Sequence, residues 1–299
     1  MNSKFKGTGV DIVTPFGKSG NIDFNSLGNI IEHVIKNNIN YIVTLETTGE
    51  ASTLSKDEKN AVLNFVIETV NKRVPLVVGM GGNNTQEVIN SIMETDFDGI
   101  DGIDAILSVA PYYNKPNQRG IFFHYKTIAN ASPVPVIIYN VPGRTSVNIE
   151  AETVLKLADE VGGIIGIKEA SGNFVQCMNI IKNKHKDFLV ISGVDALTLP
   201  LMCLGADGAI SVVANAFPKE FSEIVEFCKK DYFKRAKEMH YKLIDIINLL
   251  FVEGNPGGIK AALEILELSP NNLRLPLVKI TKSTYNQLLN LIEEYKKNE

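Results

Sequence analysis

Short apolar runs alternate with longer segments of helical periodicity along the chain as far as Pro218. Eight runs are rich in Val and Ile and have the length of strands: residues 9–13, 41–45, 75–78, 105–109, 136–139, 163–168, 188–191 and 208–212. Runs that are apolar on both faces are typical of parallel strands covered by helices. Parallel neighbours need crossover connections, so the pattern predicts a series of strand–helix units.

The segments between the runs carry the helical signals. Helices are predicted over residues 24–37, 56–70, 86–97, 118–129, 149–158, 174–184 and 196–204. Ser55 and Glu58 have the spacing of a capping box. Asp23, Thr85 and Asn173 are expected to cap the helices that follow them.

From residue 221 onward the pattern is only helical, with helices predicted over residues 221–230, 233–251, 257–267 and 281–296. Asn255 and Pro256 are expected to be a helix cap followed by proline at the first helical position. We predict an α/β protein, a (β/α)8 TIM barrel over residues 1–225 with a C-terminal helical extension over residues 226–299. The alternative is a doubly wound open sheet, but residues 14–17 are not the Gly-rich fingerprint expected after its first strand.

Composition narrows the class of partner. The chain has 299 residues, 44% hydrophobic and 21% charged, with a net charge of -4, which is typical of a globular protein. The slight acidity argues against nucleic acid or an anionic membrane as partner, and no run approaches the ~18 apolar residues of a membrane span. The three cysteines lack ligand or framework spacing, and no histidine follows a predicted strand. We therefore expect a soluble cytoplasmic protein without a metal site, whose main partner is neither nucleic acid nor an anionic membrane.

In a barrel, polar residues at the C-terminal ends of the strands build the site. Lys168 ends the sixth run and, by the two-residue period, shares a face with Ile164 and Gly166. If that face is the barrel interior, a confined apolar setting disfavours the charged amine, which lowers its pKa and favours Schiff-base formation with a carbonyl. The alternative is a solvated lysine paired with Glu169.

Three further loops carry candidate chemistry. Tyr139 shares a face with Ile137 and is a candidate proton carrier, or else a core residue. Arg144 follows Pro and Gly in a loop where a guanidinium grips a carboxylate, or is simply a surface charge. The turn from Thr47 to Glu50 offers hydroxyl and backbone N–H donors to an anion, or caps the next helix.

Together these loops resemble the dihydrodipicolinate synthase / N-acetylneuraminate lyase family of Schiff-base aldolases. The resemblance covers nearly the whole chain and rests on motifs in a fixed order at the ends of the predicted strands. The motifs are Thr14-Pro15-Phe16, Thr47-Thr48-Gly49-Glu50, Pro111-Tyr112-Tyr113-Asn114, Tyr139-Asn140-Val141-Pro142-Gly143-Arg144-Thr145, Gly166-Ile167-Lys168-Glu169 and Gly208-Ala209-Ile210-Ser211.

The resemblance implies a mechanism without a cofactor. Lys168 would condense with the ketone of pyruvate, and the resulting enamine would attack an aldehyde. Tyr139 would shuttle protons, and Thr47 would link it to Tyr113, forming a hydroxyl relay. In the family that second tyrosine reaches in from a neighbouring subunit, so the resemblance implies a homo-oligomer, a tetramer or a dimer.

The resemblance also implies how the substrates bind. Thr48 would hold the pyruvate carboxylate, and the carbonyl of Ile210 would line the site. Arg144 favours the branch of the family that takes L-aspartate 4-semialdehyde and forms 4-hydroxy-tetrahydrodipicolinate, the entry to diaminopimelate and lysine. An N-acetylneuraminate or 2-keto-3-deoxy-sugar-acid lyase is the alternative within the family. A barrel that has lost catalysis and serves in binding or regulation is the alternative outside it.

Three residues depart from the family's pattern. Glu46 stands before Thr47, where the family usually has glycine. Lys56 and Lys59 stand where lysine-inhibited members carry histidines that help to bind the inhibitor. Like charges repel a lysine ligand, so we predict weak or absent feedback inhibition by lysine.

Overall fold

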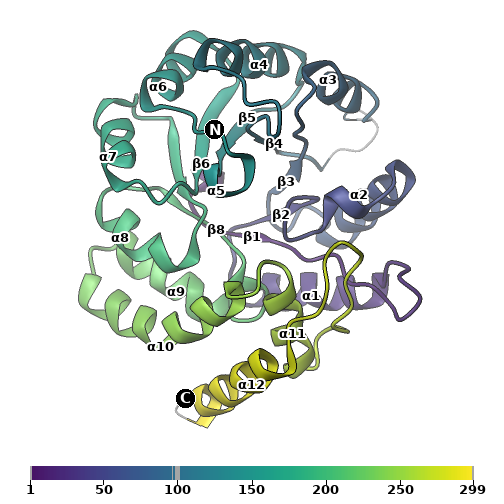
Figure 1. Ribbon diagram of the computed structural model, residues 1–299. Helices are drawn as coiled ribbons and strands as arrows, with labels where there is room; N and C mark the ends of the chain where they lie inside the picture. The colour runs from purple at the N-terminus through teal and green to yellow at the C-terminus, as the bar shows by residue number, and fades with distance from the viewer. Residues whose placement is uncertain (1, 96, 98–101, 298–299) are drawn as a thin grey trace.

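Parallel strands close into a barrel in the computed structural model, which describes residues 2–95, 97 and 102–297. Within these residues eight strands pair in chain order and β8 returns to β1, which confirms the TIM barrel and excludes the open sheet (Figure 1). The strands are β1 (Gly7–Asp11), β2 (Tyr41–Thr44), β3 (Leu76–Gly79), β4 (Ala105–Val109), β5 (Val136–Asn140), β6 (Ile164–Glu169), β7 (Leu189–Ser192) and β8 (Gly208–Ser211).

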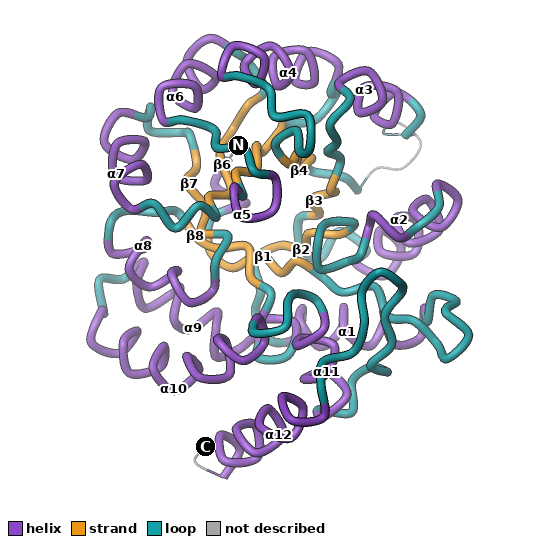
Figure 2. The backbone as a smooth tube through the Cα atoms, viewed as in Figure 1, coloured by secondary structure: helices purple, strands orange, loops and turns teal. Residues whose placement is uncertain are grey.

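Helices surround the strands, and one short helix, α5, lies inside this ring (Figure 2). They are α1 (Phe24–Lys36), α2 (Lys56–Val70), α3 (Thr85–Met93), α4 (Gln118–Ala131), α5 (Pro142–Thr145), α6 (Ala151–Glu160), α7 (Phe174–Asn183), α8 (Thr198–Cys203), α9 (Pro218–Lys229), α10 (Phe233–Phe251), α11 (Gly257–Ile265) and α12 (Lys282–Lys297). The helix predicted over residues 86–97 ends at Met93, and residue 96 lies outside the described residues. No helix in the described part of the chain is long and apolar enough to span a membrane.

Most of the predicted helix starts are confirmed. Ser55 and Glu58 form the complete capping box of α2. Asp23 and Asn173 each accept a backbone N–H in the first turn of the following helix. The cap predicted at Thr85 is wrong by one residue, because Asn84 accepts the first-turn N–H of α3.

The cap predicted at Asn255 and Pro256 is also wrong. Helix α11 begins at Gly257, without a side-chain cap. The Asn255 side chain instead donates a hydrogen bond to Thr48 Oγ1 over 3.1 Å. A contact across the barrel mouth therefore replaces the local one.

The barrel interior is filled by one face of the strands. The cluster comprises Phe5, Tyr41, Val43, Val77, Ala105, Leu107, Ile137, Tyr139, Val141, Ile165, Leu189, Ile191 and Ile210. Phe5 belongs to the N-terminal segment, which bonds through Lys4 and Asn2 to residues just before β4 and β7. This segment covers the N-terminal end of the barrel and leaves the C-terminal end open for a site.

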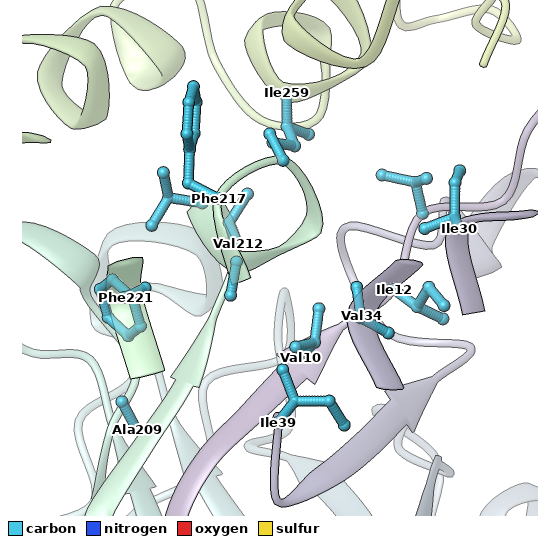
Figure 3. Close-up of a cluster of buried hydrophobic side chains, with 14 of the residues drawn as sticks. Val10, Ile12, Ile30, Val34, Ile39, Ala209, Val212, Phe217, Phe221 and Ile259 are labelled. Atoms are coloured by element: carbon cyan, nitrogen blue, oxygen red, sulfur yellow. The ribbon is translucent and has the colours of Figure 1, made fainter. Parts of the chain in front are cut away.

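The opposite face of the strands packs on the helices. Figure 3 shows Val10 of β1 and Ala209 of β8 beside Val34 of α1 and Phe221 of α9, with Ile259 of α11 above them. The C-terminal helices therefore share a core with the barrel. Helix α9 crosses residue 225, and the division predicted at that residue stays a prediction.

A buried ion pair also joins the C-terminal segment to the barrel. Lys260 of α11 bonds to Glu50, in the turn after β2, and both side chains are fully buried. Removing one partner of such a pair leaves an uncompensated buried charge. The turn that carries Thr47 and Thr48 is thus held by the C-terminal helices.

Candidate active site

Lys168 lies in the barrel interior, near the C-terminal end of β6. Its side chain is 3% exposed, and its Nζ lies 4.3 Å from the centroid of the Tyr139 ring. Nζ also lies 3.7 Å from Oδ2 of Asp11, at the end of β1. An amine, a phenol and a carboxyl group therefore meet in a space closed to bulk water.

The two-residue period used to place Lys168 does not hold through the whole of β6. Val136 pairs with Ile164, but Ile137 pairs with Gly166, so Ile165 is an extra residue in β6. Ile165 consequently joins the interior cluster, and Ile164 packs with the outer one. The face predicted for Ile164 is wrong, because a bulge reverses the alternation before Gly166.

The glycine that leaves room for Lys168 does not lie on β6, the strand that carries the lysine. A Cβ on Gly166 would meet Cβ of Leu189 at 2.7 Å, so this glycine admits the neighbouring strand. A Cβ on Gly193 would lie 3.0 Å from Cγ of Lys168 and 3.2 Å from its Cε. Gly193, after β7, is the residue that makes space for the lysine.

The charge of Lys168 differs from the sequence-based prediction. Burial acts to lower its pKa, but Tyr139, Asp11, Glu46 and Asp195 act together to raise it, and the net pKa is raised. The predicted lowering is wrong because the confined setting is acidic rather than apolar. The acidic groups around Lys168 therefore favour its ammonium form over the neutral amine.

Asp11 is a site residue that sequence reasoning missed. It is 1% exposed, and burial raises its pKa against the opposing effects of Lys168 and Thr48. Its Oδ2 accepts the Thr48 hydroxyl over 2.8 Å. The available signal was a carboxylate within an apolar strand, which has to find a buried partner.

The turn after β2 directs its donors at the protein's own carboxylates. Oε2 of Glu46 accepts the backbone N–H of Thr47 at 2.9 Å and its hydroxyl at 3.1 Å. Glu46 is 7% exposed. Burial is the largest effect that raises its pKa, and the Asp11 carboxyl group is the second, whereas Lys168 and the hydrogen bonds from Thr47 lower it. Glu46 therefore turns into the site rather than away from it.

A cavity of about 650 Å³ opens beside these residues. Its wall includes Glu46 and Thr47 from the turn after β2, and Arg144 from α5. Lys168 does not line it, but Glu46 both lines it and acts on the charge of Lys168. The cavity thus adjoins the lysine through Glu46 and has room for a small organic acid.

Comparison with known proteins identifies the family. The model of the dihydrodipicolinate synthetase family matches residues 4–295. The chain belongs to this family.

Similar proteins support that assignment over the full length. A protein of Flavobacterium psychrophilum named 4-hydroxy-tetrahydrodipicolinate synthase is 48% identical over 284 residues, covering 95% of this chain and 96% of that protein. The crystal structure of dihydrodipicolinate synthase from Aquifex aeolicus is 39% identical with a TM-score of 0.93, covering 98% of each chain. A monomeric dihydrodipicolinate synthase variant is 36% identical with a TM-score of 0.95, covering 99% of this chain and 98% of that one.

Arg144, the residue that pointed to one branch of the dihydrodipicolinate synthetase family, lies in the one-turn helix α5. The backbone N–H groups of Arg144 and Thr145 both bond to the carbonyl of Val141. The Arg144 side chain lines the cavity and makes no ion pair with any described residue. Its guanidinium is therefore available to a carboxylate in the cavity.

The hydroxyl relay implied by the resemblance is not assembled within one chain. The Thr47 hydroxyl bonds to Glu46, and in the described part of the chain no hydrogen bond joins it to Tyr139 or Tyr113. Tyr113 is 89% exposed, with a left-handed backbone (φ 71°) that projects it from the loop after β4. The Tyr113 side chain therefore lies at the surface of the chain rather than inside its own barrel.

The remaining site residues lie where β7 and β8 end. Ile210 is buried in the interior cluster, facing the same space as Tyr139. Asp195, which sequence reasoning also missed, is buried and accepts the N–H groups of Val212 and Val213 at 3.0 and 2.9 Å. Asp195 lies far from Lys168 along the chain, so no local sequence pattern connects the two residues.

Proposed function

We propose that the protein is a Schiff-base aldolase that condenses pyruvate with L-aspartate 4-semialdehyde to form 4-hydroxy-tetrahydrodipicolinate. The observation that carries the proposal is Lys168, buried at the mouth of the barrel against the Tyr139 ring and the Asp11 carboxyl group. The family and the name of the Flavobacterium relative support the same reaction. Nothing in these comparisons favours the sugar-acid lyase alternative.

The first step requires a neutral amine. The acidic groups around Lys168 favour its ammonium form, so a base has to take its proton before it attacks C2 of pyruvate. Asp11 lies 3.7 Å from Nζ, and burial raises its pKa, so its carboxylate is suited to accept that proton. The amine then adds to the carbonyl to give a carbinolamine.

The second step expels water. Burial raises the pKa of Tyr139, which keeps its phenol protonated and able to donate to the departing hydroxyl group. Loss of water forms the imine on Lys168. The phenolate left on Tyr139 takes a proton from C3 to give the enamine, whose C3 forms the new bond to the aldehyde carbon while Tyr139 protonates the aldehyde oxygen. The amino group of the second substrate then replaces Lys168 at C2, which closes the ring and frees the lysine.

Two donor groups are proposed for the two carboxylates. The turn at Thr47 and Thr48 would hold that of pyruvate, beside Lys168. Arg144 would hold that of the aldehyde, because it lines the 650 Å³ cavity and pairs with no acidic side chain among the described residues. The cavity would then admit the second substrate while the first is bound to the lysine.

We further propose a homo-oligomer in which Tyr113 of one copy completes the site of another, as its exposure supports. One of the similar structures is a monomeric variant, so the oligomeric state of this protein has to be measured. The proposed reaction needs no cofactor. A cytoplasmic location is part of the proposal, and the three free cysteines support it.

The test is chemical trapping. Borohydride added with pyruvate should reduce the imine and leave a covalent adduct on Lys168, located by peptide mass spectrometry. Lys168→Ala should abolish both the adduct and turnover in an assay that supplies pyruvate and aspartate semialdehyde. An unmodified Lys168 in the wild type would refute the aldolase and favour the catalytically silent barrel.

A further inference from the structure

Glu46 occupies donors of the turn proposed to hold the substrate's carboxylate. Both the N–H and the hydroxyl of Thr47 bond to its Oε2. The hydroxyl of Thr48 bonds to Asp11. In the resting protein, two internal carboxyl groups therefore take the hydrogen bonds that a keto acid would need.

Of these two groups, Glu46 is the one with room to leave. Asp11 is 1% exposed, does not line the cavity, and is held by both Thr48 and Lys168. Glu46 lines the 650 Å³ cavity together with Thr47. Rotation of its side chain would carry the carboxyl group from the Thr47 donors into that space.

The charge of Glu46 decides how strongly it holds Thr47. An ionised carboxylate accepts hydrogen bonds about twice as strongly as a neutral group. The titratable groups around it are Lys168 on β6, Asp11 on β1, Tyr139 on β5 and Tyr125 on α4, together with those of the cavity wall: Arg144, Glu87, Glu94, Lys56, Lys59 and Tyr112. Burial and Asp11 favour the protonated form, against Lys168 and Thr47.

We propose that Glu46 is an internal competitor for the substrate's carboxylate: ionised Glu46 holds the Thr47 donors, and the keto acid binds once Glu46 turns into the cavity. The inference rests on the proposed function, because it takes an α-keto acid as the ligand of this turn. Protonation weakens the internal bonds and eases the exchange. The pyruvate concentration needed for half-saturation therefore rises as the pH rises through the titration of Glu46.

The experiment measures the pyruvate concentration that gives half-maximal borohydride trapping, over a series of pH values. Glu46→Gly should lower this concentration by roughly 10- to 100-fold, since a hydrogen bond to a charged group contributes roughly 1.5–3 kcal/mol, and should remove its rise with pH. Glu46→Gln keeps the size without the charge and should give an intermediate value that does not rise with pH, while the dependence that comes from Lys168 remains. Glu87→Gln removes an exposed carboxylate from the same cavity wall and should behave as the wild type.

If Glu46→Gly needs the same pyruvate concentration for half-maximal trapping as the wild type, and this concentration changes with pH in the same way, the inference is overturned. The aldolase proposal is then left intact. An equal fall in the half-saturating pyruvate concentration of Glu87→Gln also overturns the inference, because the loss of any negative charge from the cavity wall would then have the same effect. A wild type that pyruvate and borohydride never modify overturns the aldolase and the inference together. If Glu46→Gly does not fold, as circular dichroism would show, Glu46→Gln decides.

Discussion

Lys168 Nζ lies 3.7 Å from Asp11 Oδ2, although β6 and β1 are not neighbours in the barrel. The pair crosses the barrel interior and joins the residue proposed to react with one near the start of the chain. Two more carboxyl groups, Glu46 and Asp195, act on the same lysine. The site is consequently acidic, and its chemistry depends on which group holds the proton.

Asp11→Asn should shift the pH at which Lys168 becomes reactive. Asp11 raises the pKa of Lys168, so without this carboxylate the amine loses its proton at lower pH. The pH of half-maximal borohydride trapping should fall. Breaking a buried pair also costs about 3–5 kcal/mol, which denaturant unfolding would measure. Asp159→Asn, on the exposed face of α6, is the control, and an unmoved pH midpoint in Asp11→Asn would contradict the assignment.

Arg144→Ala should raise KM for aspartate semialdehyde by roughly 10- to 100-fold, the cost of a lost charge-assisted bond. KM for pyruvate should stay unchanged, since Arg144 is assigned to the second substrate. Steady-state kinetics with each substrate varied in turn would measure both constants. Arg119→Ala, on the exposed side of α4, is the matched control. Normal turnover of aspartate semialdehyde by Arg144→Ala would remove this residue from substrate recognition.

Tyr113 should act in a neighbouring subunit's site. Tyr113→Ala and Lys168→Ala should each be nearly inactive when expressed alone. When the two variants are coexpressed, mixed dimers contain one intact site, so about a quarter of the wild-type activity should return. Sedimentation would establish the oligomeric state in the same preparations. Full activity of Tyr113→Ala alone would show that the site needs no partner.

Glu58 should contribute stability that is lost in acid. Its hydrogen bonds with Arg274 and Ser55 lower its pKa from 4.5 to about 2. A carboxyl group with a depressed folded-state pKa stabilises above pH 4.5, and the contribution fades as the pH falls towards 2. Because the pair is partly solvated, Glu58→Gln should cost only about 1 kcal/mol at pH 7.

The measurement for Glu58 is urea unfolding at pH 7 and again near pH 3. The difference between Glu58→Gln and the wild type should shrink at the lower pH. Glu68→Gln, on the exposed face of the same helix, should show little difference at either pH. If the difference in the free energy of unfolding between Glu58→Gln and the wild type widened in acid, the pKa of Glu58 would not be lowered in the folded protein.

Lysine should inhibit the enzyme weakly or not at all. Lys56 and Lys59 line the same cavity as Glu46, and Lys56 pairs with Glu94 over 2.8 Å. Two ammonium groups on one wall disfavour a ligand that carries another. A dose series at subsaturating pyruvate would measure this. Strong inhibition at micromolar lysine would contradict the prediction.

Much of the fold was predictable because its signals are local. Apolar runs of strand length predicted the strands of the barrel, and the box at Ser55 and Glu58 predicted the start of α2 to the residue. Lys168 and Tyr139 became candidates because each lies near the end of a predicted strand, and barrels place such residues at one mouth. Position along the chain left other interpretations open, and the resemblance to the family gave the two residues their roles.

Tertiary structure decided the electrostatics and the direction of the hydrogen bonds. The pKa of Lys168 rises rather than falls because Tyr139, Asp11, Glu46 and Asp195 converge on it from other strands and from the loops after them. The hydroxyl of Thr47 bonds to Glu46, which the sequence showed only as a departure from the family pattern. Alternation along a strand tells which residues face inward, but charge and donor direction depend on distances between atoms that are remote in the chain, and only the closed barrel sets those.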